Sequence, residues 1–136
     1  MSRRPDARGT AQRPAPVPRQ VAWDEAELAL ALVSGKWVLR VLQVLDGRGP
    51  CRHNQLLREL GGKVSARSLD ATLRRMEKAG LVNRHVDPGS PPAVSYELTR
   101  LATSLIGPLA TLGRWSLAHQ RELRPRGRRR PEDPAA

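Results

Sequence analysis

Residues 53–98 read HNQLLRELGGKVSARSLDATLRRMEKAGLVNRHVDPGSPPAVSYEL, and this stretch decides the fold. It opens with a short segment, 53–60, whose leucines recur at helical spacing and which two glycines end. A longer segment with helical periodicity follows at 65–79. Residues 81–98 then alternate apolar and polar side chains around a turn rich in proline and glycine. The sequence therefore predicts a short helix, a tight turn, a longer helix and a β-hairpin, in that order.

The longer helix has one apolar face and one basic face. Leu69, Leu73 and Met76 are spaced by four and three residues, as in the buried stripe of an amphipathic helix. Ser65 is the expected N-cap, and Gly80 is the expected C-terminal stop. The opposite face is polar and basic, and it comprises Arg67, Ser68, Ala71, Thr72, Arg74, Arg75 and Lys78.

The hairpin follows this helix directly. We expect one strand from Leu81 to Asp87, a turn at 88–92, and a return strand in which Val94, Tyr96 and Leu98 alternate with polar residues. A short helix, a glycine-containing turn and an amphipathic helix with a basic outer face form a helix-turn-helix, and the hairpin beside it is a wing. The expected fold is therefore mainly α with a small β-hairpin wing, a winged helix-turn-helix.

A first helix is expected from Trp23 to about Val33. Asp24 is positioned as an N-cap with Glu27 three residues later, as in a capping box, and Trp23 and Leu28 are placed as a hydrophobic staple.

Two more helices complete the expected domain. Residues 36–45 are apolar on most sides, which predicts a core helix that residues 46–50 end. The last helix should run from an N-cap at Thr99 to about Leu123, with a kink or break at Pro108.

The charge is uneven along the chain. Lys and Arg number 24 against 13 Asp and Glu, a net charge of +11 over 136 residues. A chain of this length fits one domain. Residues 1–20 and 124–136 are rich in Arg and Pro and poor in apolar residues, so we expect a disordered basic arm and a disordered tail around a domain at 21–123. These ends either aid solubility or hold phosphates, and the sequence favours neither.

Double-stranded DNA is the expected partner. A single helix fits the major groove, and side chains of its N-terminal half meet base edges, where Arg can contact guanine through two hydrogen bonds. We expect Arg67 to contact a base and Arg74 or Arg75 to bind phosphate. The wing around residues 88–92, with Arg84 and His85 at its base, should touch the backbone or the minor groove. The candidate DNA contacts are Ser65, Arg67, Ser68, Thr72, Arg74, Arg75, Arg84 and His85.

A homodimer is expected because the helix at 65–79, the recognition helix of the helix-turn-helix, covers only a few base pairs by itself. A two-fold dimer contacts two half-sites about 34–36 Å apart, so the operator should be pseudo-palindromic. The first and last helices carry more apolar surface than the domain needs for its own core. The candidate dimerisation residues are Trp23, Leu28, Leu101, Leu105, Leu109, Leu112 and Trp115.

Several other functions are disfavoured. His53, His85 and His119 lack companion ligands, so we expect no metal or cofactor, and no catalytic motif indicates an enzyme. Single-stranded nucleic acid is disfavoured because exposed stacking rings are few. No apolar run is long enough for a membrane span or a secretory signal, and a cytoplasmic, nucleoid-associated location is expected.

The single cysteine excludes a disulfide framework within one chain. Arg52 and His53 beside Cys51 could lower its pKa and make it a redox-sensing thiol, although a small buried residue is the favoured interpretation.

Residues 23–119 resemble the HxlR-type regulators, which are close to MarR-like winged-helix proteins. The resemblance lies in LVSGKW at 32–37, in Leu73-Arg74 and GLV at 80–82, and above all in PPAVSYELT at 91–99. It implies a homodimer that binds an operator near a promoter, in some members with sensing of an electrophile or another small molecule, which the sequence does not identify. Such members often carry a cysteine where this chain has Asp24.

Three functions remain in competition. The leading hypothesis is a sequence-specific regulator of transcription. The alternative is a non-specific architectural DNA-binding protein that uses its basic ends, which would bind all duplexes alike. A third is a protein-interaction module on the same scaffold, which the arginines of the recognition helix disfavour.

Overall fold

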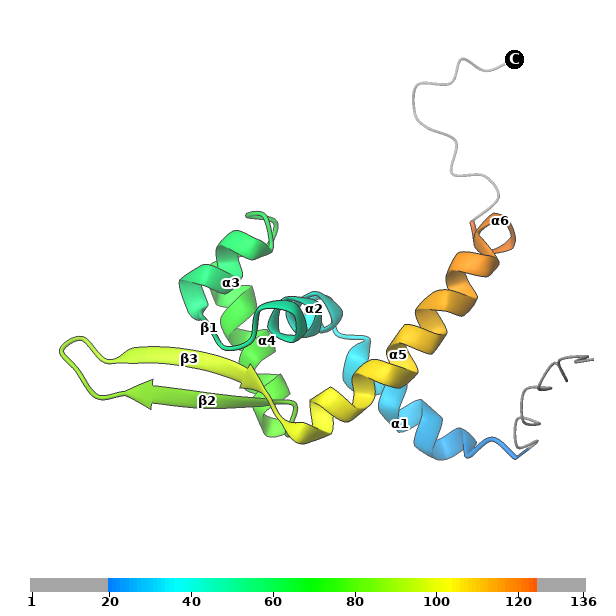
Figure 1. Ribbon diagram of the computed structural model, residues 1–136, viewed down its shortest axis with the longest axis horizontal. Coiled ribbons are helices and arrows are strands. Elements are labelled where there is room, and N and C mark those ends of the chain that lie inside the picture. Colours follow the sequence, from blue (N-terminus) through cyan, green and yellow to red (C-terminus); the bar gives the residue numbers. More distant parts are fainter. Residues whose placement is uncertain (1–19, 125–136) are drawn as a thin grey trace, which may run out of the picture.

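The computed structural model describes residues 20–124, so the expected basic arm and Arg/Pro-rich tail lie outside the described residues except for Gln20 and Arg124. Figure 1 shows a helical body with a hairpin that projects to one side. The elements in chain order are α1 (Trp23–Val33), α2 (Val38–Arg48), β1 (Cys51–Arg52), α3 (His53–Glu59), α4 (Ala66–Lys78), β2 (Val82–Asp87), β3 (Ala93–Leu98), α5 (Arg100–Ala118) and α6 (Gln120–Leu123). The expected winged helix-turn-helix fold is confirmed.

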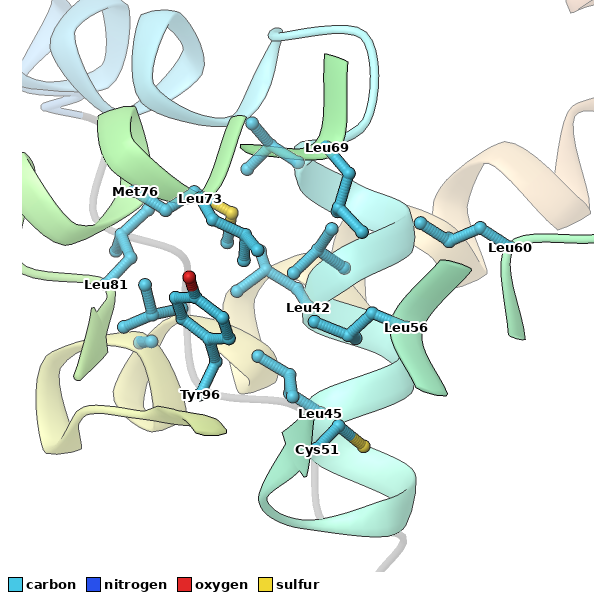
Figure 2. Close-up of a cluster of buried hydrophobic side chains, with 14 of the residues drawn as sticks. Leu42, Leu45, Cys51, Leu56, Leu60, Leu69, Leu73, Met76, Leu81 and Tyr96 are labelled. Carbon is cyan, nitrogen blue, oxygen red and sulfur yellow. The ribbon is translucent and has the colours of Figure 1, made fainter. Parts of the chain in front are cut away.

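The core lies where α2, α3, α4 and the base of the hairpin meet (Figure 2). Leu42, Leu56, Leu69 and Leu73 are each at most 1% exposed. Burial of a leucine side chain of this kind contributes roughly 1.5–3 kcal/mol. The apolar stripe that the sequence predicted for the recognition helix is therefore the surface that fixes this helix to the rest of the domain.

The hairpin belongs to a three-stranded antiparallel sheet with the strand order β1-β3-β2. Tyr96 of β3 is paired with Arg84 of β2 on one side and with Cys51 of β1 on the other. Only two strands were expected from the sequence. The strand β1 was missed because a two-residue strand has no alternation that periodicity can detect.

The turn between α3 and α4 uses the two glycines as expected. Gly61 and Gly62 have φ values of 68° and 71°, a region that other residues rarely adopt. Ser65 then caps α4, because its Oγ accepts a hydrogen bond from the Ser68 N–H at 3.0 Å. Gly80, with φ of 76°, ends the helix. This confirms the expected boundaries of the recognition helix.

Expectations for the other helices need correction. The N-cap of α1 is Ala22, which makes no side-chain bond, so the expected capping box is wrong. Trp23 and Leu28 are 75% and 65% exposed, so they form no buried staple. The core helix was expected at 36–45, but it extends from Val38 to Arg48.

Helix α5 begins after the expected N-cap and passes Pro108 without a break. It ends at Ala118, short of Leu123, and the short helix α6 follows. In Figure 1 the first half of α5 crosses α1, on the side of the domain opposite the wing.

Among residues 20–124, no single helix is long and apolar enough to cross a membrane. Together, α1 and α2 would be long and apolar enough for a membrane span, but the two helices are bent by 79° with respect to each other.

Candidate nucleic-acid interface

The outer face of α4 is exposed and basic. Arg67, Ala71, Arg74, Arg75 and Lys78 are all accessible to solvent, while the opposite face of the helix is buried. Because the buried leucines hold this helix rigidly, its arginines project from a fixed platform. A fixed helix is the arrangement that insertion into a major groove requires.

The N-terminus of α4 is organised by two serines. Besides accepting the cap bond, Ser65 Oγ donates a hydrogen bond to Ser68 Oγ at 3.0 Å. Both residues are exposed, as the sequence analysis expected. Their first role is to fix the start of the helix that carries Arg67.

Thr72 does not belong to the exposed site, contrary to the expectation from the sequence. Its side chain was expected on the outer face, but the residue is only 1% exposed. Its Oγ1 donates a hydrogen bond to the Ser68 carbonyl oxygen at 2.9 Å. Thr72 therefore lies at the edge of the buried face, where it cannot contact a base.

The two neighbouring arginines of α4 differ in their surroundings. Arg74 forms an ion pair with Asp70, one turn earlier, with an N–O distance of 3.2 Å. No ion pair within residues 20–124 involves Arg75. Arg75 is therefore the arginine whose charge is fully available to a phosphate, whereas Arg74 must share its charge with a carboxylate.

At the base of the wing, a polar hollow separates the sheet from α4. It is lined by Asp70, Arg74, Glu77, Arg84 and Tyr96. The exposed Arg84 is thus brought to one side of the recognition helix.

His85 points elsewhere. Neighbouring residues of a strand face opposite sides of the sheet, so His85 lies on the side away from Arg84. Its Nε2 is 2.5 Å from Oε1 of Glu97, a contact between β2 and β3. Because its imidazole already has a carboxylate partner, His85 is a weaker candidate for a DNA contact than Arg84.

A second hollow lies along the outer face of α4, and nothing in the sequence pattern pointed to it. Lys36 and Trp37, just before α2, line it together with Arg67, Arg75 and other residues of α4. These two segments are about thirty positions apart in the chain, so no local pattern could bring them together. The available signal was only that Lys36 is a charged residue at the start of a mostly apolar segment.

The surplus apolar surface expected on α1 and α5 is present. Trp23, Leu28, Leu101, Leu112 and Trp115 are between 47% and 75% exposed. The two other expected residues differ: Leu105 and Leu109 are half-buried and pack against the core of their own domain. An apolar hollow between α1 and α5 is lined by Ala29, Leu32, Leu81, Leu101, Ser104, Leu105 and Pro108.

Cys51 is buried, with 1% of its surface exposed. Burial raises the pKa of its thiol, the Arg48 guanidinium opposes this effect, and the Glu59 carboxylate adds to it. The suggestion that neighbouring residues lower this pKa is therefore wrong, and the alternative of a small buried residue agrees with the structure. Within the described part of the chain, no group of three or more His, Cys, Asp or Glu side chains is placed to hold a metal ion.

A basic helix fixed beside a two-stranded wing defines the class of winged helix-turn-helix DNA-binding proteins. A sequence model of the HxlR-like helix-turn-helix family matches residues 32–123 of this chain. The chain belongs to that family, as its resemblance indicated, and it is a transcriptional regulator of the helix-turn-helix type.

Relatives and solved structures agree with this assignment. The HTH-type transcriptional regulator BH0655 of Halalkalibacterium halodurans is 34% identical over 91 residues, which cover 67% of this chain and 80% of that protein. The regulator YtcD of Bacillus subtilis is 36% identical over 93 residues, or 68% of this chain and 72% of that one. The crystal structure of a MarR-family regulator from Enterococcus faecalis superimposes with a TM-score of 0.69 at 32% identity, covering 79% of this chain and 96% of that one.

Proposed function

We propose that this protein is a homodimeric regulator of transcription that binds a specific duplex DNA sequence. Helix α4 enters the major groove, and the hairpin of β2 and β3 acts as the wing. The observation that carries the proposal is the combination of an exposed, basic outer face on α4 with an inner face whose leucines are at most 1% exposed. A rigid helix of this kind can hold arginines in the groove at defined positions.

Within the site, the residues have different roles. Arg67 lies in the first turn of α4, where it meets base edges and can contact guanine through two hydrogen bonds. Arg75 lies about two turns further along α4, and it binds a phosphate. Arg84 reaches the DNA backbone from the wing. Ser65 and Ser68 hold the helix start and leave its first N–H groups near a phosphate.

The homodimer rests on the apolar side chains of α1 and α5. Trp23, Leu112 and Trp115 are at least 47% exposed, and large apolar side chains left exposed on these two helices favour an interaction surface. A two-fold dimer would present two copies of α4 to half-sites one helical turn apart, which predicts a pseudo-palindromic operator. The named relatives of this chain are bacterial, and bacterial DNA lies in the cytoplasm, so the expected location is the cytoplasm, at the nucleoid.

Selection of bound sequences from random duplex DNA tests this function. A specific regulator should enrich one motif with two related halves, and its affinity for that motif should exceed its affinity for random duplexes by about 10³-fold or more at physiological salt. Binding without enrichment, with strong salt dependence, would identify the protein as an architectural DNA-binding protein instead. The net charge of +11 is the observation that keeps this alternative.

A further inference from the structure

Lys36 lies beside the recognition helix, although it belongs to a different part of the chain. It precedes Trp37, the N-cap of α2, and both residues line the hollow that also contains Arg67 and Arg75. The hollow holds four cationic side chains and one carboxylate, Asp70, which is itself paired with Arg74. This side of α4 therefore carries a surplus of positive charge.

The position of Lys36 is fixed by its neighbour. Trp37 is half-buried and packs against the core. The Lys36 ammonium lies 5.6 Å from the centre of the Trp37 ring, within the range of a cation–π contact. Within residues 20–124, Lys36 takes part in no ion pair, so its charge is available to a ligand.

The two hollows share Asp70 and Arg74 but extend to different edges of α4. Ser68 and Arg75 line only the hollow with Lys36, while Glu77 lines only the hollow with Arg84. Lys36 and Arg84 thus flank the recognition helix from two separate elements. A helix in the major groove has a phosphate backbone on each side of it, so each flanking cation faces a different DNA strand.

We infer that Lys36 is a further DNA contact, whose ammonium binds a backbone phosphate on the side of the groove opposite to that reached by Arg84. This inference rests on the proposed function, because it takes α4 as the helix in the major groove. The contact supplies affinity and orientation and carries no sequence information. It makes the start of α2 part of the DNA-binding surface, in addition to the helix-turn-helix and the wing.

The test compares Lys36→Gln with Lys36→Arg and with Arg121→Gln, a matched loss of one positive charge on α6. Binding of the full-length protein to a fluorescein-labelled duplex is measured by anisotropy over a range of NaCl concentrations. The duplex carries the selected motif, or a random sequence if selection yields none. Each lost phosphate contact lowers the slope of log affinity against log salt by about 0.9. We expect Lys36→Gln to lower the slope by this amount for each bound protomer. Lys36→Arg and Arg121→Gln should keep the wild-type slope.

Ethylation interference on the same duplex locates the phosphate. Lys36→Gln should abolish interference at a position that Arg84→Gln leaves intact. If Lys36→Gln keeps the slope and the interference pattern of Arg121→Gln, Lys36 is no contact, while the proposed function stands. If the wild-type protein binds no duplex, both the proposed function and this inference fall.

Discussion

Thr99 Oγ1 donates a hydrogen bond of 2.5 Å to the carbonyl oxygen of Gly80, nineteen positions earlier in the chain. Thr99 Oγ1 also accepts a hydrogen bond from the Ala102 N–H at 3.1 Å, as the cap of α5, and the Thr99 N–H donates to the Leu81 carbonyl oxygen at 3.1 Å. One residue therefore connects the end of the recognition helix to the start of the helix that carries the apolar surface. The orientation of α5 relative to α4 is set here.

Thr99→Ala should lower the free energy of unfolding by about 1–2 kcal/mol, because the cap of α5 and the bond to Gly80 are lost together. Thr99→Ser keeps a hydroxyl in place and should recover most of this loss. Thr103→Ala is the matched control, since among residues 20–124 the exposed Thr103 hydroxyl bonds only to the carbonyl oxygen of Thr99, one turn earlier. Urea unfolding followed by circular dichroism measures all three, and equal losses in Thr99→Ala and Thr103→Ala would contradict the assigned role.

Two glycines should respond to alanine in opposite directions. Gly80 has φ of 76°, and an alanine in this left-handed region should destabilise the protein by roughly 1–2 kcal/mol. The cost comes from the backbone and not from a clash, because the atom nearest to the added Cβ, Leu101 Cδ2, is 3.8 Å away. Gly47 lies inside α2, with nothing within 4 Å of an added Cβ, so Gly47→Ala should stabilise the protein by about 0.5–1 kcal/mol. Thermal unfolding decides the matter, and stabilisation by Gly80→Ala would show that the helix end is not held as described.

Arg67 and Arg75 should differ in what their removal does to DNA binding. Arg67→Ala should cost about 1–3 kcal/mol on the selected motif and little on random duplexes, which reduces specificity. Arg75→Ala should weaken binding to every duplex alike and lower the salt slope by about one. Anisotropy titrations give the affinity of each variant for the selected motif and for a random duplex. Equal losses for the two variants on both duplexes would refute the separation of base and phosphate contacts.

Cys51 should make stability fall at alkaline pH. Its folded pKa is raised by burial above the ordinary value of about 8.5, so the neutral thiol is favoured in the native state. The stabilisation that comes from burying the neutral thiol is fully present below the unfolded pKa, and it is lost as pH rises through the raised folded pKa. The difference in unfolding free energy between the wild type and Cys51→Ala should therefore be constant from pH 6 to 8 and should shrink above about pH 9. A constant difference up to pH 10.5 would show that the thiol is not desolvated.

The recognition helix could be predicted from the sequence because its signals are local. Ser65, the two glycines before it and the stripe of Leu69 and Leu73 lie within thirteen residues, and each acts through its near neighbours. Thr72 was misplaced because the buried face is wider than the stripe: a residue directly before a buried leucine lies only 100° from it around the helix. Its buried hydroxyl is satisfied by the Ser68 carbonyl, which no sequence pattern signals.

What the sequence could not give depends on contacts between distant segments. The strand β1 exists because Cys51 pairs with Tyr96, and the position of Lys36 beside Arg75 depends on how α2 packs across α4. The same holds for Leu105 and Leu109, which share the helical periodicity of exposed Leu112 but turn toward their own core. Periodicity identifies an apolar face, but only packing shows which part of that face the domain itself covers.

Leu112 therefore offers the sharper test of the homodimer, because it is 47% exposed whereas Leu105 serves the core. Leu112→Glu places a charge on the apolar surface of α5, which should dissociate the dimer and abolish tight binding to the selected motif while the domain itself stays folded. Val86→Glu is the matched control, since Val86 is 50% exposed on the wing, away from α1 and α5. Sedimentation at micromolar concentration should give twice the chain mass of 15.0 kDa for the wild type and Val86→Glu, and a single chain mass for Leu112→Glu. A wild-type monomer that still binds a palindromic duplex tightly would refute the dimer, because a single copy of α4 contacts only one half-site.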